Sequence, residues 1–137
     1  MTELTDLIPE FDQIKDKNLR QKTITVWREA LDIGGWSLED LSEMPYTLLV
    51  ENVDITFPEH VSVVCRLCIA MEDVLQKAYG DRYCIDRDTL IAGALLADVG
   101  KLIEFHKEGS DYKWASMYQY LRHPFTVVGL CFKHEIP

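Results

Sequence analysis

The sequence predicts an all-α fold, and three observations support this prediction. Apolar residues recur at helical spacing over residues 17–33 and 58–79, mostly on one side of each segment. Residues that cap helices, such as Asp16 and Ser37, stand immediately before segments of this kind. Nowhere in the sequence does the apolar–polar alternation of a half-buried strand compete with the helical pattern.

The first half of the chain is expected to form short and medium helices. The expected helices cover residues 2–11, 17–33 and 38–43. Asp16 caps the second of them, and Gly34 and Gly35 end it because glycine readily adopts the left-handed conformation found after a helix. Ser37 caps the third helix, and Pro45 ends it.

The second half is expected to contain the longest helix and two others. The expected helices cover residues 58–79, a segment that starts after Asp86 or Asp88 and runs to the stretch 95–101, and a segment that starts at Pro124. Pro58 suits a first helical position, and Val74 belongs to the predicted apolar stripe of its helix. Asp86 or Asp88 caps the next helix. Residues 108–120 are polar and aromatic by turns and are expected to form a loop with one irregular helical turn.

Length and charge restrict the classes of protein. A chain of 137 residues is long enough for one domain with a real core, so residues 1–137 are expected to form a single domain. The net charge of -9 argues against binding to a nucleic-acid polymer or to an acidic membrane surface, because both require basic patches. No apolar run approaches the roughly 18 residues of a membrane span.

The N-terminal segment and the cysteines predict a cytoplasmic location. Residues 1–10 carry acidic side chains and no basic region, which is unlike a secretory signal. The cysteines are therefore expected to be reduced thiols. Cys65 and Cys68 have the spacing of a redox or zinc pair, but they lie at core spacing within the helix over 58–79, where buried thiols are the favoured interpretation.

The segment 95–101 (LLADVGK) contains the most informative acid in the chain. Asp98 follows an apolar pair and should lie at the edge of the core, where a lone charge is too costly. Gly100 suits a bend or a close approach, and Lys101 lies three residues after Asp98, at helix-neighbour spacing. Two interpretations remain open from spacing alone: an internal Asp–Lys pair, or a carboxylate that binds a cation.

Two histidines from other helices make the second interpretation more specific. His60 lies one turn into the helix over 58–79, and His123 directly precedes Pro124. A lone histidine near a helix start is more often a capping or hydrogen-bonded residue than a ligand. Imidazole and carboxylate nevertheless bind the same divalent metals, and helical bundles build metal sites from different helices. His60, Asp98 and His123 are therefore predicted to meet around one metal site.

The remaining histidines are expected to lie outside that site. His134 follows His123 by eleven residues, which is roughly 16 Å along an unbroken helix and too far for two ligands of one metal. His106 and its neighbour Lys107 are expected to be solvated loop residues.

Three motifs in this chain resemble the HD-domain superfamily. They are residues 57–60 (FPEH), 92–101 (AGALLADVGK) and 122–129 (RHPFTVVG). That superfamily comprises metal-dependent phosphohydrolases, including cyclic-nucleotide phosphodiesterases and nucleotidases, and a few di-iron oxygenases. The resemblance extends from Phe57 to the C-terminus and, more loosely, over the N-terminal region.

The resemblance implies a helical bundle, with residues 1–56 as an N-terminal helical region and residues 57–137 as the metal-site core. By position, His60 is similar to the first metal ligand, and Asp98 to the acid of the His-Asp pair, which can bridge two metals. Lys101 resembles a lysine that faces the phosphate or a metal-bound hydroxide, so the resemblance gives Lys101 and Asp98 catalytic roles. His123 resembles a ligand of a second metal. The implied cofactor is a divalent ion (Mn, Fe, Mg, Ni, Co or Zn).

Two departures from the family pattern affect the expected activity. Ala97 stands where the family has the histidine of its His-Asp pair, and a methyl group cannot ligate a metal. The family also continues through further helices with later histidines and a final aspartate, so the bundle is expected to lack its C-terminal helices. Weak metal binding and little hydrolysis are therefore predicted.

The leading functional hypothesis is an impaired metal-dependent phosphohydrolase that acts on a small phosphorylated substrate or nucleotide. The alternative is a non-catalytic module of the same fold that binds a nucleotide or a protein, which Ala97 favours and the retained His60, Asp98, Lys101 and His123 disfavour. A di-iron oxygenase is a third possibility, and iron content with oxygen-dependent turnover would distinguish it. Apolar faces left uncovered would drive association, so a homo-oligomer with the last helix at the contact is expected.

Overall fold

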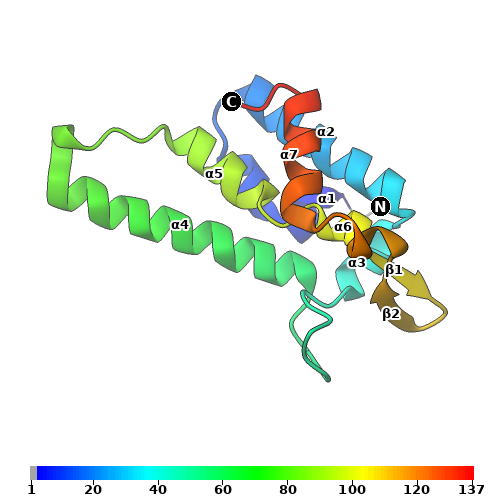
Figure 1. Cartoon of the computed structure of the whole chain (residues 1–137). Helices are drawn as coiled ribbons and strands as arrows, with labels where there is room; N and C mark the ends of the chain where they lie inside the picture. The colour runs from blue at the N-terminus through cyan, green and yellow to red at the C-terminus, as the bar shows by residue number, and fades with distance from the viewer. Residues whose placement is uncertain (1–2) are drawn as a thin grey trace.

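A computed structural model describes residues 3–137 and shows a mainly helical chain with one small two-stranded sheet, which confirms the predicted fold class (Figure 1). In chain order the elements are α1 (Leu4–Leu7), the 3₁₀ helix η1 (Pro9–Gln13), α2 (Lys17–Gly34), α3 (Leu38–Glu43), α4 (Phe57–Tyr79), the 3₁₀ helix η2 (Gly80–Arg82), α5 (Arg87–Leu96), α6 (Lys101–Glu104), β1 (Phe105–Glu108), β2 (Asp111–Trp114), the 3₁₀ helix η3 (Ser116–Gln119) and α7 (His123–Lys133).

The helices pack around α5. The long helix α4 lies along α5, and α2 crosses on the other side, where it contacts both α5 and α6 (Figure 1). Helix α7 is anchored on α2 by its C-terminal end, where Lys133 and His134 both contact the carboxylate of Glu29 and Lys22 donates to the carbonyl of Glu135 at 3.0 Å. This packing brings the start of α4, the end of α5 and the start of α7 toward one another.

The core is centred on Trp27, which is fully buried. Its ring stacks on Phe57 at a centroid distance of 5.6 Å and meets the edge of Phe11 at 6.0 Å. Its indole Nε1 donates a hydrogen bond to the carbonyl of Leu95 at 2.9 Å. One side chain therefore joins α2 to η1, to the first residue of α4 and to the last turn of α5.

Side-chain caps begin three of the helices, as the sequence predicts. Asp16 accepts hydrogen bonds from two backbone N–H groups of α2, and Ser37 and Asp86 cap α3 and α5. Gly35, with φ of 73°, ends α2 in the left-handed conformation. Asp88 does not cap α5; its carboxylate accepts a hydrogen bond from the backbone N–H of Asp16 at 2.7 Å and ties α2 to α5.

The main departure from the sequence prediction is a β-hairpin. Strands β1 and β2 pair antiparallel, with Phe105 opposite Trp114, where the prediction had a loop. His106 and Lys107 therefore lie in a strand and not in a solvated loop. Each strand has only four residues, which is too short for a recognisable alternation of apolar and polar side chains.

Tertiary contacts stabilise this hairpin. Tyr112 stacks on Trp36 at 6.1 Å, next to the end of α2. Lys107 donates a hydrogen bond to Asp40 of α3 at 2.5 Å. This bond, together with that from Ser37, lowers the pKa of Asp40 to about 2. These partners lie more than sixty residues away along the chain, so local sequence does not reveal them.

The structure refines two other predicted boundaries and corrects one predicted burial. The first predicted helix is divided at Pro9 into α1 and η1, and its residue 2 lies outside the described residues. Helix α5 ends at Leu96, so it includes only the first two residues of the stretch 95–101. Val74, assigned to the apolar stripe of α4, is 66% exposed, because the second half of α4 extends beyond the helices that cover its first half (Figure 1).

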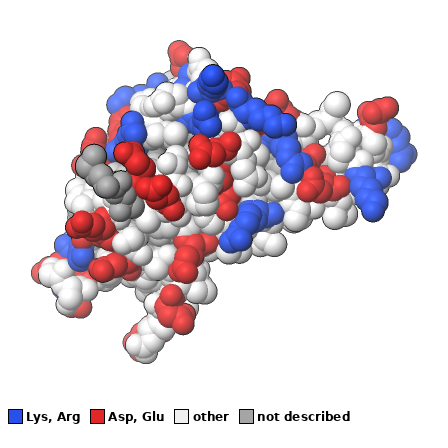
Figure 2. Space-filling view, turned by 180° about the vertical axis from the view of Figure 1, so that it is seen from behind, with Lys and Arg blue, Asp and Glu red and all other residues white. Residues whose placement is uncertain are grey.

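Within residues 3–137, none of the helices combines the length and apolar character needed to cross a membrane. On the face drawn in Figure 2, acidic and basic side chains are interspersed with uncharged surface. The predicted cytoplasmic location and the division of the chain at residue 56 stay predictions.

Candidate functional site

Asp98 lies in the turn that joins two helices. Helix α5 ends at Leu96, and residues 97–100 form a turn before α6 begins at Lys101. Leu95 and Val99 are fully buried, whereas the side chain of Asp98 is 25% exposed. The carboxylate thus lies at the edge of the core, with its oxygens accessible to neighbouring helices.

Two histidines approach the two oxygens of this carboxylate. Nε2 of His60, in the first turn of α4, lies 3.1 Å from Oδ2 of Asp98. Nε2 of His123, the first residue of α7, lies 3.4 Å from Oδ1. The structure therefore brings together the three residues that the sequence proposes as metal ligands, each from a different helix or turn.

Lys101 completes the cluster. Its Nζ donates to Oδ2 of Asp98 at 2.8 Å and to the backbone carbonyl of Tyr46 at 3.1 Å. The ammonium lies 5.8 Å from the ring centroids of both Tyr46 and Phe57, within the range of a cation–π interaction. The ring of Tyr46 also stacks on His60 at 4.7 Å. The predicted internal Asp–Lys pair and the predicted cluster with histidines are thus both present.

These neighbours keep the Asp98 carboxylate ionised. Burial by itself would raise the pKa of Asp98, but the hydrogen bond and the charge of Lys101 lower that pKa below its ordinary value. A carboxylate at this position therefore remains negative near neutral pH and available to a cation.

Gly100 permits the close approach of α7 to this turn. A Cβ atom added at Gly100 would lie 2.9 Å from Cα of His123 and closer still to the side chain of Thr126. Any larger residue at this position would move the start of α7 away from Asp98. The bend or close approach predicted for Gly100 is thus a close approach to the His123 backbone.

The sequence analysis missed Glu104, which contacts His123 from the other side. The Glu104 side chain is 1% exposed, and its Oε2 lies 2.5 Å from Nδ1 of His123. Arg122 donates to its other oxygen, Oε1. A signal was available, because Glu104 lies between apolar residues in Leu102–Phe105 and, like Asp98, could not be buried without a partner.

The site has the right donor types for a divalent metal but few donors. Two imidazole nitrogens and a carboxylate suit borderline divalent ions. The two histidines contact different oxygens of Asp98, and so form two separate pairs with it. Within residues 3–137, no group of three or more His, Cys, Asp or Glu side chains is placed to hold a metal ion. Ala97, exposed beside Asp98, supplies no donor. His60, Asp98 and His123 therefore fit a metal in kind and leave most of a coordination sphere to be filled.

A hollow on the surface shares one residue, His60, with this cluster. It is lined by Asp54, Ile55, Glu59, His60 and Val63.

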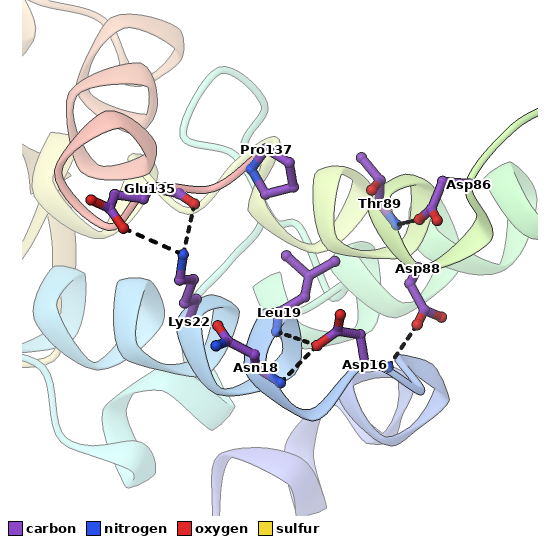
Figure 3. A pocket seen from close by; sticks show the side chains of 9 residues that line it. All are labelled: Asp16, Asn18, Leu19, Lys22, Asp86, Asp88, Thr89, Glu135 and Pro137. Carbon is purple, nitrogen blue, oxygen red and sulfur yellow. Dashed lines mark hydrogen bonds and ion pairs between the residues drawn. The ribbon is translucent and has the colours of Figure 1, made fainter.

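A separate pocket, shown in Figure 3, lies between the starts of α2 and α5 and the C-terminal residues. Its acids are already engaged, since Asp16 and Asp86 cap helices and Lys22 is paired with Glu135. We therefore place the candidate site at Asp98.

Cys65 and His134, which the sequence analysis also considered, do not contribute to the candidate site. The thiol of Cys65 is free and fully buried, and this burial raises its pKa to about 11, which agrees with a packing role. His134 lies at the opposite end of α7 from His123 and contacts Glu29.

Comparison with known proteins gives one relevant similarity. No family model and no solved structure matches the chain. The chain is 32% identical over 139 residues to the dihydroneopterin 2',3'-cyclic phosphate phosphodiesterase of Methanocaldococcus jannaschii. That alignment covers 96% of this chain and 53% of the relative, so the chain spans about half of the relative's length. In sequence, this chain is thus similar to part of a phosphodiesterase.

Proposed function

We propose that this chain carries the Asp98-centred half of an HD-type, metal-dependent phosphohydrolase site that acts on small phosphate esters. The observation that carries the proposal is the convergence of His60, His123 and Lys101 on the single carboxylate of Asp98. The similarity to a phosphodiesterase supports the same class of reaction.

Each residue has a role that follows from its chemistry. His60, Asp98 and His123 would hold the divalent ion, which, when bound, lowers the pKa of a water molecule and neutralises charge on a phosphoryl group. Lys101 carries a fixed positive charge 2.8 Å from Asp98, where it would stabilise negative charge that develops on the phosphoryl oxygens. Tyr46 holds both Lys101 and His60 in place through its carbonyl and its ring.

The substrate we propose is a small phosphodiester. The hollow beside His60 would take its organic part, because it shares His60 with the cluster and combines apolar side chains, Ile55 and Val63, with two carboxylates, Asp54 and Glu59. Such carboxylates can accept hydrogen bonds from the N–H groups of a heterocyclic base or pterin. The relative's substrate, a pterin cyclic phosphate by its name, belongs to this chemical class.

A non-catalytic binding module is the second candidate. The observation that favours it is the contact between the ammonium of Lys101 and the carboxylate of Asp98. This ammonium already neutralises Asp98, and Ala97 supplies no metal donor. The same cluster could then bind a phosphate-bearing ligand without hydrolysing it.

The two candidates differ in Mn²⁺ binding and turnover. We expect the chain to bind Mn²⁺ weakly, to hydrolyse bis(4-nitrophenyl) phosphate slowly in its presence, and to lose both properties in Asp98→Asn. Electron paramagnetic resonance of free Mn²⁺ and release of nitrophenolate measure them. Asp73→Asn, which removes an exposed acid paired with Arg87, is the matched control and should change neither. Equal Mn²⁺ binding by the chain and Asp98→Asn would refute the metal site, and Mn²⁺ binding without turnover would favour the binding module.

We also propose that the chain forms homo-oligomers through α7. Three large apolar side chains, Phe125, Val128 and Phe132, are each more than 60% exposed and recur at helical spacing along one side of α7. Because a stripe of this kind on one helix is self-complementary about a two-fold axis, a second copy is the occupant we propose.

Phe132→Glu is expected to convert such an oligomer into a monomer, because a carboxylate cannot be buried unpaired in an apolar contact. Light scattering at micromolar concentration measures the mass. Leu49→Glu, at an exposed position between α3 and α4, is the matched control and should leave the mass unchanged. A monomeric parent chain would contradict the proposal.

A further inference from the structure

We propose that Glu104 is a positioning residue that holds His123 in one tautomer, with its Nε2 directed at Asp98, and that Arg122 fixes Glu104 for this task. The tautomer follows from the contacts of Glu104 with Arg122 and His123, whereas its consequence for metal binding rests on the function proposed above.

The carboxylate of Glu104 contacts both Arg122 and His123. Its side chain is 1% exposed and lies at the end of α6. A buried carboxylate is tolerated when charge and hydrogen bonds compensate its lost hydration. Arg122, which is always protonated, supplies the charge at Oε1. The second oxygen can then only accept, so Nδ1 of His123, 2.5 Å away, must be the donor.

This hydrogen bond determines what His123 presents to Asp98. In the neutral form of the ring with its proton on Nδ1, the lone pair is on Nε2, which lies 3.4 Å from Oδ1 of Asp98. Two acceptors then face each other, an arrangement that a cation between them stabilises. Histidines that ligate metals generally donate their other ring N–H to a carboxylate or carbonyl in this way.

The hairpin that the sequence did not predict supports Arg122. The guanidinium lies 4.5 Å from the ring centroid of Tyr118 and 5.6 Å from that of Trp114. The backbone N–H of Ala115 donates to the carbonyl of Glu104 at 2.8 Å. The hairpin and η3 thus hold both members of the Arg122–Glu104 pair against the start of α7.

The opposite end of α7 provides a matched control. There Glu29 contacts both Lys133 and His134, so a carboxylate again binds a basic residue and the histidine that follows it. No Asp98 equivalent belongs to that contact within residues 3–137. Glu29→Gln therefore makes the same chemical change at a histidine of the same helix, away from the proposed site.

The test compares the parent chain, Glu104→Gln and Glu29→Gln. In Glu104→Gln the amide oxygen is expected to accept from Arg122, which turns the NH₂ group toward Nδ1 of His123 and makes that nitrogen an acceptor. The protonated nitrogen of His123 is identified by side-chain ¹⁵N NMR without metal. The measurement is made at about pH 8.5, where a histidine of ordinary pKa (about 6.5) is neutral. For His123 we expect Nδ1–H in the parent and in Glu29→Gln, and mainly Nε2–H in Glu104→Gln.

The Mn²⁺ affinity is the second measurement, and we expect it to fall about 10- to 100-fold in Glu104→Gln and to stay unchanged in Glu29→Gln. An Nε2–H tautomer in the parent chain would overturn the proposal even if the variant failed to fold, as would an unchanged tautomer in a folded Glu104→Gln. If neither protein binds Mn²⁺ while the tautomer shifts as expected, the proposed metal site fails and the positioning role of Glu104 stands.

Discussion

Ala97→His is expected to raise the affinity of the chain for Mn²⁺ at least tenfold, or about 1.4 kcal/mol, and to increase phosphodiester hydrolysis with it. Ala97 is exposed and adjoins Asp98 in the turn after α5, so an imidazole can be added there without displacing the core. It would supply the nitrogen donor that the cluster of His60, Asp98 and His123 lacks. Titration of free Mn²⁺ and release of nitrophenolate measure the two effects.

Ala78→His is the control for this gain. Ala78 is exposed near the far end of α4, eighteen residues after His60 and so about 27 Å from it along the helix. A similar gain in Mn²⁺ affinity at Ala78 would show that any added surface histidine suffices. No gain from Ala97→His would count against the HD-type site and leave the non-catalytic module as the better hypothesis.

Trp27→Ala is expected to lower the free energy of unfolding by about 3–5 kcal/mol, as truncation of a buried aromatic residue generally does. The indole is fully buried, contacts Phe11 and Phe57, and donates to the carbonyl of Leu95. Since domains of this size are stable by about 5–15 kcal/mol, the loss is a large share of the total. Urea unfolding followed by circular dichroism measures it.

Trp27→Phe separates packing from the hydrogen bond. It retains most of the ring contacts and removes only the indole N–H, so a smaller loss of about 1–3 kcal/mol is expected from the unpaired Leu95 carbonyl. Because Leu95 lies three residues before Asp98 in the chain, Trp27→Phe should also weaken Mn²⁺ binding by the proposed site. A loss equal to that of Trp27→Ala would mean that the hydrogen bond, and not the packing, dominates.

Much of the helical framework could be predicted from local patterns. The cap at Asp16, the serine cap at Ser37 and the left-handed Gly35 are decided within four or five residues, because their hydrogen bonds are made to neighbours in the chain. Asp98 was recognisable as a candidate because an acid after a buried apolar pair needs a partner. Its association with His60 and His123 followed from metal-ligand chemistry and from the resemblance.

The hairpin and the Glu104 cluster could not be predicted in this way. Strands β1 and β2 are too short to show alternation, and they are held by contacts such as that of Tyr112 with Trp36, which are distant in sequence. The exposure of Val74 is also a tertiary result, since helical periodicity identifies an apolar face but not whether another element covers it.

The sequence by itself therefore determined the helical class, the caps and the chemical identity of the cluster around Asp98, because these depend on residue type and local spacing. Only the tertiary structure decided that Lys101 and both histidines reach the same carboxylate, and that Arg122 and Glu104 lie behind His123. The physical reason is that the site joins α4, α6, α7 and the turn after α5 through side-chain contacts across the fold, which no local pattern encodes.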